Sequence, residues 1–292
     1  MGIFIDNEMK VVVQGITGRE GKYHTGLMLQ YGTNIVAGCS PGKGGQIINE
    51  VPIYDAVEET VRHEGANTSI IFVPPGFAVD ALYEAAEAGI RLIICITEGI
   101  PALDAMHALR RIDVMYPETR IIGPNSPGII IPGKSLIGIM PGNIFSQGRV
   151  GIISRSGTLT YQIAYDLTNA GIGQSSVIGV GGDPFIGVKF IDLLELFNED
   201  PETEAVCIIG EIGGSDEEEA ADYIKNKFSK PVVAYVAGQT APAGKKMGHA
   251  GAIISATAGT ASSKMKALKE AGAVTVSTPY EVADAIKNVL GK

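Results

Sequence analysis

Cysteine is scarce in this chain, with three residues among 292. Cys39, Cys95 and Cys207 lie far apart, in or beside apolar stretches that are typical of strands. A disulfide framework uses an even set of cysteines and a zinc cluster uses closely spaced ligands, so this spacing favours neither. We therefore expect three buried free thiols and no metal site.

Long apolar stretches and an excess of basic residues are also lacking. No apolar run reaches the length needed to cross a bilayer, and no charged-then-apolar signal segment precedes the first strand-like stretch. Thirty-two acidic residues against 23 basic ones give a net charge of −9, which disfavours a broad nucleic-acid contact surface. We expect a soluble cytoplasmic protein with neither a nucleic-acid nor a membrane partner.

Short β-rich stretches alternate with helical ones through the first half of the chain, which predicts βαβ units and a parallel sheet. The apolar runs of this half lie at 10–15, 34–39, 68–73 and 91–97. The alternation begins again at 150–155 and ends with two helices near 259–271 and 279–290. Pattern and length together predict two α/β domains.

Glycine and proline are concentrated between the two predicted domains. Residues 123–149 contain four prolines and six glycines, too many for a helix. We predict a domain at 1–123, an irregular Gly/Pro-rich connection at 124–149, and a second domain at 150–292.

A glycine-rich turn follows the first predicted strand and precedes a helix. Gly15, Gly18 and Gly21 fall where backbone N–H groups can bind a phosphate, although a plain strand-to-helix turn uses the same residues. A nicotinamide dinucleotide site usually adds an acidic residue about twenty positions later, and none occurs between residues 22 and 49. Lys43 stands there instead. A lysine suits an additional ribose phosphate, as in CoA or NADP, unless it is merely solvated.

Thr97 and Glu98 end another predicted strand, at the sheet edge where ligands of α/β proteins bind. The same two residues could instead begin a helix cap, and the sequence does not rank these two interpretations.

Residues 128–135 read G-I-I-I-P-G-K-S and match the Walker A pattern in form only. Three isoleucines disfavour the backbone of a phosphate loop, Pro132 removes an N–H donor, and the next residues cannot form the required helix. We infer that any nucleoside triphosphate binds outside this chain.

A second candidate anion site begins the second half of the chain. Residues 154–158 follow a predicted strand and open a helix, so hydroxyl and N–H groups gather at the positive end of a helix dipole. This turn is not a serine-hydrolase elbow, because its residues S-R-S-G-T do not match G-x-S-x-G. The predicted phosphate ligands are Ser154, Ser156, Gly157 and Thr158.

His249 differs from the other histidines in its surroundings, because Gly248 and Gly251 leave room for a bulky group on its imidazole. Glu211 ends a predicted central strand, and a carboxylate bound to one ring nitrogen leaves the other nucleophilic. Together with the 154–158 turn, these residues could form a phosphohistidine site, although a structural histidine satisfies the same pattern. Helical, charged neighbours predict surface positions for the other three: His24, His63 and His107.

Eight motifs, in order and over nearly the whole chain, resemble the α subunits of succinyl-CoA synthetase (succinate–CoA ligase). They are Q-G-I-T-G-R-E-G, S-P-G-K-G-G, I-T-E-G-I-P, G-P-N-S-P-G, S-R-S-G-T-L-T-Y, G-G-D-P, G-E-I-G-G and G-H-A-G-A-I. The resemblance implies an N-terminal Rossmann-like CoA-binding domain followed by a flavodoxin-like doubly wound ligase domain. It also implies a ligase that joins succinate and CoA at the expense of a nucleoside triphosphate, through a phosphohistidine.

The same resemblance implies roles for individual residues. It implies that His249 is phosphorylated, that Glu211 supports it, and that Tyr161 contacts the substrate. Ser126 stands where many family members have cysteine, which puts in doubt only a local CoA contact. The implied CoA contacts are Thr17, Gly18, Arg19, Glu20, Lys43, Ile96, Thr97 and Glu98.

The resemblance further implies a β subunit with an ATP-grasp fold that binds ATP or GTP with Mg. The choice of nucleotide and the number of subunits cannot be read from this chain. Three alternatives remain open at this point: a malate–CoA ligase α subunit, a non-catalytic CoA-sensing module, and an NADP oxidoreductase.

Overall fold

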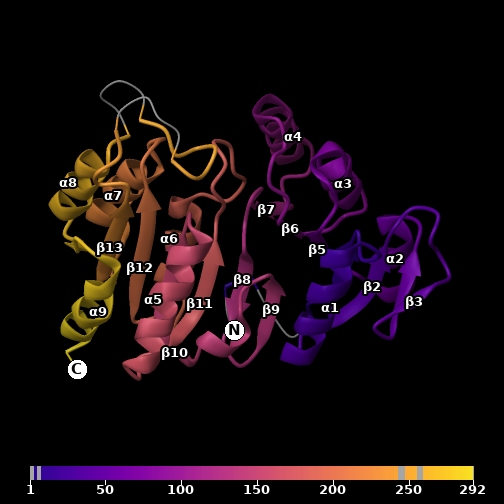
Figure 1. Ribbon diagram of the computed structural model, residues 1–292, viewed down its shortest axis with the longest axis horizontal. Coiled ribbons are helices and arrows are strands. Elements are labelled where there is room, and N and C mark those ends of the chain that lie inside the picture. Colours follow the sequence, from indigo (N-terminus) through magenta and orange to yellow (C-terminus); the bar gives the residue numbers. More distant parts are fainter. Residues whose placement is uncertain (1–2, 5–7, 243–246, 255–258, 292) are drawn as a thin grey trace.

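The computed structural model describes residues 3–4, 8–242, 247–254 and 259–291, and within them the chain forms two seven-stranded sheets (Figure 1). Each sheet is built from one half of the sequence, with helices packed on its faces. Among the described residues, no helix is long and apolar enough to cross a membrane.

The first sheet has the strand order β3-β4-β2-β1-β5-β6-β7 and is parallel except for the pair β3–β4. Strands β1, β5 and β6 are buried along their whole length, as expected of a parallel sheet covered on both faces. The order reverses between β1 and β5, the position where such sheets bind ligands. The elements are β1 (Val11–Gln14), α1 (Arg19–Tyr31), β2 (Ile35–Cys39), β3 (Ile47–Ile48), β4 (Val51–Tyr54), α2 (Val57–Glu64), β5 (Thr68–Ile71), α3 (Pro75–Glu87), β6 (Leu92–Cys95), α4 (Ala102–Met115) and β7 (Arg120–Ile122).

The second sheet has the order β14-β13-β12-β10-β11-β8-β9. Strand β10 lies between β11 and β12, so the chain runs outward from β10 in one direction to β11 and in the other to β12. The strand order therefore reverses between β10 and β12, and the carboxyl ends of these two strands flank a second position where such sheets bind ligands. The elements are β8 (Gly128–Ile131), β9 (Ser135–Gly138), η1 (Gly142–Ile144), β10 (Gln147–Ser154), α5 (Gly157–Asn169), β11 (Gln174–Gly179), α6 (Phe190–Glu199), β12 (Ala205–Glu211), α7 (Asp216–Lys227), β13 (Val232–Ala237), α8 (Ala261–Glu270), β14 (Val274–Thr275), η2 (Pro279–Glu281) and α9 (Val282–Leu290).

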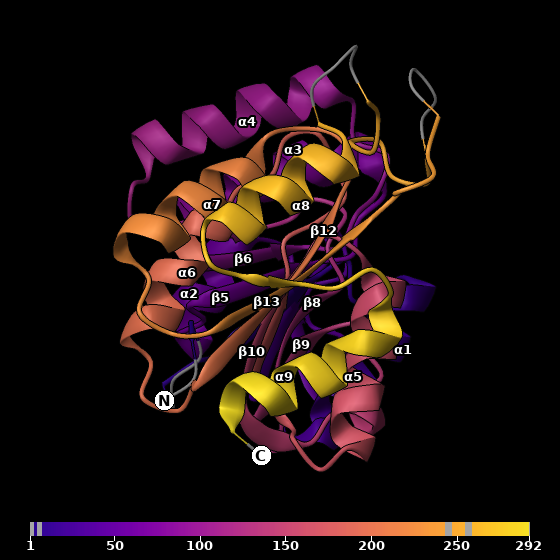
Figure 2. The same ribbon diagram turned by 90° about the vertical axis from the view of Figure 1, so that its left-hand side faces the viewer.

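Helices cover both faces of the second sheet (Figure 2). Helices α6, α7 and α8 lie together on one face, and α5 and α9 lie on the other. The predicted final pair of helices is therefore present, as α8 and α9, but the two members lie on opposite faces.

The segment between the two predicted domains is not irregular, so that expectation is wrong. Strands β8 and β9 form an antiparallel hairpin, and β8 continues the second sheet by pairing with β11. The prolines of this segment do not prevent strand pairing, because they lie outside the two strands: Pro127 precedes β8, Pro132 begins the turn, and Pro141 follows β9. The hairpin also occupies the false Walker A stretch, where β9 replaces the helix that a P-loop requires. The domain limits themselves stay a prediction.

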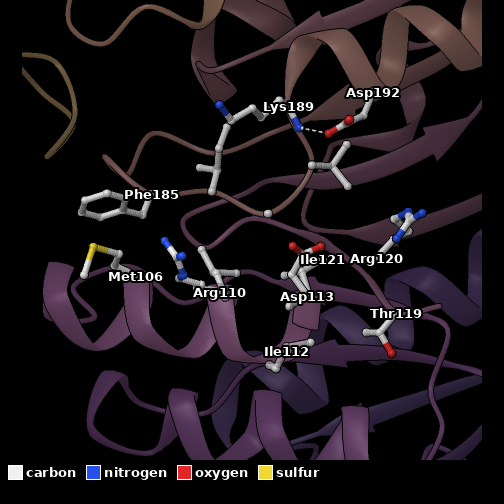
Figure 3. Close-up of a pocket in the computed structure, with 14 residues that line it drawn as sticks. Met106, Arg110, Ile112, Asp113, Thr119, Arg120, Ile121, Phe185, Lys189 and Asp192 are labelled. Carbon is white, nitrogen blue, oxygen red and sulfur yellow. Dashed lines mark hydrogen bonds between the residues drawn. The ribbon is translucent and has the colours of Figure 1, made fainter. Parts of the chain in front are cut away.

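The two sheets are joined along a seam. Val188 N donates to Ile121 O (2.7 Å), and the Thr33 side chain donates through Oγ1 to Leu136 O (2.5 Å), so hydrogen bonds to backbone carbonyls join the two halves. A groove of about 650 Å³ runs along this seam between α4, β7 and residues 185–192 (Figure 3). One buried apolar cluster includes residues from both sheets, which holds the halves in one arrangement.

The three cysteines are free and buried, as predicted. Burial, which disfavours the thiolate, raises the pKa of each of Cys39, Cys95 and Cys207 to about 12. These thiols therefore stay protonated at neutral pH and supply no nucleophile.

Candidate active site

Glu211, the last residue of β12, meets His249, which lies between β13 and α8 in the sequence. Its Oε2 lies 2.7 Å from the imidazole Nδ1. The Glu211 side chain is 8% exposed and that of His249 is 29% exposed, so the carboxylate lies inside and the ring lies at the surface. The hydrogen bond to Glu211 raises the pKa of His249 against the opposing effect of burial. With Nδ1 engaged, Nε2 is the nitrogen available for chemistry.

Two glycines near His249 differ in how tightly they are packed. Gly248 has open space around it, whereas a Cβ atom on Gly182 would lie 2.3 Å from the imidazole Cγ. The loop is fastened there, because Gly251 N donates to Gly182 O (3.1 Å). The ring is thus packed closely against Gly182, and part of it stays exposed to solvent.

Arg155, which the sequence analysis did not single out, lies behind the carboxylate. Its side chain is 4% exposed and its Nε is 3.3 Å from Glu211 Oε1. The guanidinium also donates to Asp216 Oδ2 (2.8 Å) and to Asp183 O (2.9 Å). Arg155 thus pairs with the carboxylate of Glu211 on the side away from the imidazole and links it to two other segments. Its position directly after β10, beside the predicted anion turn, was the signal available in the sequence.

The turn at 154–158 lies at the carboxyl end of β10, as predicted. Some of its polar groups form hydrogen bonds with one another. Ser154 Oγ is buried, donates to Ser156 O (2.9 Å) and accepts from Ser156 N (3.0 Å). Ser156 caps α5, with its Oγ accepting from Leu159 N (3.4 Å). The N–H groups of Gly157 and Thr158 fall in the first turn of α5, where a helix offers no internal acceptor. Tyr161 stands one turn further along, and burial raises the pKa of its hydroxyl.

The glycine-rich turn lies at the carboxyl end of β1, beside the reversal of the first sheet. Gly18 N donates to Gly15 O (3.0 Å), which closes the turn, and Thr17 Oγ1 donates to Ser40 Oγ (3.1 Å). Arg19 and Glu20 are exposed and pair with each other (3.0 Å). This arrangement leaves the turn open to a ligand on its outer side.

Lys43 is exposed on a loop that Asp55 holds in place. The N–H groups of Lys43 and Gly44 donate to Asp55 Oδ1 at 2.9 and 2.8 Å. Asp55 directly follows β4, the strand next to β2. Its contact with the Lys43 loop could not be predicted from the sequence, because it depends on the pairing of these two strands.

Ile96, Thr97 and Glu98 line a cavity of about 270 Å³ together with Glu20. Thr97 Oγ1 donates to Val73 O (2.8 Å) rather than capping a helix, because α4 begins later, after Pro101. The helix-cap interpretation of Thr97 and Glu98 is therefore wrong. Glu98 also contributes to the raised pKa of His249, which places this cavity within electrostatic reach of the imidazole.

His24 lines the same cavity, so its expected surface position is wrong. Its side chain is 15% exposed and its ring stacks on Phe72, with centroids 5.7 Å apart and planes 4° from parallel. Burial lowers the pKa of His24 against the opposing effect of Glu20. His63 and His107 are exposed, as predicted.

Comparison with known proteins identifies the family. A CoA binding domain model matches residues 6–99, and a CoA-ligase model matches residues 153–274. The α subunit 2 of the ADP-forming succinate–CoA ligase of Archaeoglobus fulgidus is 59% identical over 99% of this chain and 100% of its own length. The corresponding α subunit of Aquifex aeolicus is 53% identical over 99% of this chain and 95% of its own length. The chain belongs to the succinate–CoA ligase α-subunit family.

Membership of the succinate–CoA ligase α-subunit family confirms the predicted family and the predicted ligase class. The fold class, a CoA-binding α/β domain followed by a CoA-ligase α/β domain, is confirmed as well. The fold recurs in ATP citrate lyase from Methanothrix soehngenii, with a TM-score of 0.87 and 24% identity over 99% of this chain, which spans 50% of the lyase chain.

Proposed function

We propose that this chain is the α subunit of a succinate–CoA ligase in which His249 carries the phosphoryl group. The reaction is succinate + CoA + NTP ⇌ succinyl-CoA + NDP + phosphate. One observation carries the proposal: Nδ1 of His249 lies 2.7 Å from Glu211, while 29% of the His249 side chain stays exposed. A nucleophilic imidazole needs one nitrogen fixed and the other exposed.

Three transfers complete the reaction. Nε2 of His249 attacks the terminal phosphorus of the nucleotide, an N–P bond forms, and the nucleoside diphosphate leaves. A carboxylate of succinate then attacks the same phosphorus, which breaks the N–P bond and gives succinyl phosphate. The CoA thiol, losing its proton, attacks the acyl carbon and expels phosphate. The energy of the nucleotide is thereby retained in covalent intermediates.

Glu211 supports the transfers at Nε2. Its carboxylate accepts a hydrogen bond from Nδ1–H, which fixes the tautomer and stabilises the positive charge that develops on the ring as the N–P bond forms. Arg155 pairs with that carboxylate and holds it in position.

The start of α5 supports phosphoryl binding. The N–H groups of Gly157 and Thr158 and the positive end of the α5 dipole favour an anion. Ser154 and Ser156 were predicted as direct ligands, but their hydrogen bonds inside the turn favour an indirect part for Ser154, which shapes the turn. Tyr161, on the same helix, is proposed to contact succinate.

The first domain is proposed to hold CoA. The turn at Thr17–Glu20 would bind the diphosphate with its backbone, and Lys43 would bind the phosphate on the ribose. The arm of CoA would follow the cavity lined by Ile96, Thr97 and Glu98 toward His249.

The nucleotide and its Mg are proposed to bind to a β subunit with an ATP-grasp fold. The β8–β9 hairpin occupies the P-loop-like stretch of this chain, which supports a nucleotide site elsewhere. A partner would bring the nucleotide to the exposed side of His249. The choice between ATP and GTP belongs to that partner, and a cytoplasmic location stays a prediction.

Labelling tests the proposal directly. The chain, assembled with a β subunit, is incubated with nucleotide labelled on its terminal phosphate, and the modified peptide is found by mass spectrometry. We expect one acid-labile phosphate on His249, none in a His249→Asn variant, and unchanged CoA binding by that variant. Succinyl-CoA formation by His249→Asn would refute the relay.

A further inference from the structure

A second, fully buried ion pair lies directly beneath Glu211. Glu217, in the first turn of α7, and Lys264, in α8, form an ion pair in which both side chains are 0% exposed. The other acidic residues in this turn of α7, Asp216, Glu218 and Glu219, are partly or fully exposed, so Glu217 is set apart from them. None of the reaction steps above uses either member of the buried pair.

The pair holds the backbone on both sides of Ile212. Glu217 Oε1 accepts from the N–H of Glu211 at 3.0 Å, and Lys264 Nζ donates to the carbonyl of Gly213 as well as to Glu217. The end of β12 is therefore fixed by side chains from two helices at the residue that carries the carboxylate behind His249.

The fixed backbone continues into the loop of His249. Gly213 N donates to Gly259 O (2.8 Å), and a Cβ atom on Gly213 would lie 2.0 Å from Gly251 O. A displacement of the end of β12 would therefore move Glu211 and press on Gly251, two residues after the imidazole.

Stability alone is a weak explanation for this pair. Removing two charges from water costs several kcal/mol for each ion, and apolar residues of similar size often serve a protein core equally well. Burial raises the pKa of Glu217, whereas Lys264 opposes that shift. The feature that apolar residues cannot reproduce is the oxygen that accepts from the N–H of Glu211.

We propose that Glu217 and Lys264 are positioning residues, which hold Glu211 at the distance from His249 that phosphoryl transfer requires. Glu217 acts through its hydrogen bond to the backbone of Glu211, and Lys264 orients Glu217 and anchors Gly213. This inference rests on the phosphohistidine proposed above.

Two double variants separate the hydrogen bond from the charges. Glu217→Gln with Lys264→Met removes both charges and keeps a side-chain oxygen within reach of the Glu211 N–H. Glu217→Met with Lys264→Met removes the same charges and also the acceptor. Neither leaves an unpaired buried charge, which is the usual reason why a broken pair unfolds a protein. Lys266→Met, at an exposed position of the same helix, is the matched control.

The readout is the rate of His249 phosphorylation in the enzyme assembled with its β subunit, with KM for the nucleotide and the thermal midpoint measured on the same samples. We expect the Gln/Met variant within about threefold of wild type and the Met/Met variant slower by about tenfold or more at unchanged KM. Equal rates for the two variants at equal folded fractions would overturn the proposal, because the pair would then serve the fold alone.

Two further measurements keep the test decisive. If the Met/Met variant does not fold, Glu217→Asp replaces it, because the shorter side chain keeps the charge for Lys264 and withdraws the oxygen from Glu211. The same slowing is expected, and a wild-type rate contradicts positioning. If wild-type His249 takes no phosphate, the proposed function fails, and NMR titration of His249 tests positioning by itself. Loss of the Glu211 contact then lowers the pKa of His249 in the variant, and an unchanged pKa rejects the inference.

Discussion

Gly182 and His249 are in contact so close that no other residue fits at position 182. A Cβ atom there would lie 2.3 Å from the imidazole Cγ and 2.6 Å from its Nδ1. The ring therefore packs directly against Gly182, and we expect the Nδ1–Oε2 pair at 2.7 Å to depend on this close packing.

Gly182→Ala should slow the phosphorylation of His249 by about 10²-fold, because a displacement of roughly 1 Å in a reacting group has that effect. The measurement is the single-turnover rate of labelling by nucleotide in the assembled enzyme. Gly76→Ala, in α3 with open space around it, is the matched control. A normal labelling rate in a folded Gly182→Ala variant would show that the ring position is not critical.

The pH dependence of labelling should report the Glu211 contact. The hydrogen bond to Glu211 raises the pKa of His249, so the neutral, nucleophilic ring becomes available only above the ordinary histidine value of about 6.5. The wild-type rate should therefore rise with pH to a midpoint above that value. In Glu211→Gln the midpoint should move to lower pH, and the plateau should fall by about 10²-fold.

The Glu211→Gln variant does not leave Arg155 without partners. In Glu211→Gln it keeps its bonds to Asp216 and to Asp183 O, so the variant leaves no isolated buried cation. An unchanged midpoint in the variant would mean that the contact does not control the protonation of His249.

The sequence was sufficient for the parts of the site that depend on strand order. Glu211 and the 154–158 turn each follow a buried apolar run, and parallel strands deliver their carboxyl ends to one edge, so their proximity could be predicted. His249 was found from its small neighbours. The hairpin β8–β9 was missed because its pairing with β11 joins residues about fifty positions apart, which no local pattern records. Arg155, His24 and Asp55 were missed because the direction of a side chain depends on tertiary packing.

Lys43 should discriminate between CoA and its analogue without the ribose phosphate. Lys43→Met removes the proposed cation, so the Kd for CoA should rise about tenfold while the Kd for dephospho-CoA stays the same. Calorimetric titration with both ligands measures this difference. Lys269→Met, at an exposed position of α8, is the control. Equal weakening for both ligands would place the lysine away from the ribose phosphate.

Asp55→Asn tests the loop that presents Lys43. The carboxylate accepts from two N–H groups, and an amide oxygen accepts them more weakly because it carries no charge. We expect a smaller loss of CoA affinity than in Lys43→Met, again confined to the ligand with the ribose phosphate. A loss of the same size for dephospho-CoA would indicate a general disturbance of the first domain.

Ser126 should act on stability and not on chemistry. Its hydroxyl is buried, donates to Gly179 O (2.5 Å) and accepts from Gly128 N (2.9 Å), so it links the start of β8 to the end of β11. Ser126→Ala leaves both backbone groups without this partner and should lower the free energy of unfolding by roughly 1–3 kcal/mol. Ser126→Cys should lower it less, because sulfur is a weak donor and acceptor. Thermal unfolding and the Kd for CoA are measured together, with Ser262→Ala on exposed α8 as the control. A loss of CoA affinity at unchanged stability would instead place this hydroxyl in direct contact with the ligand.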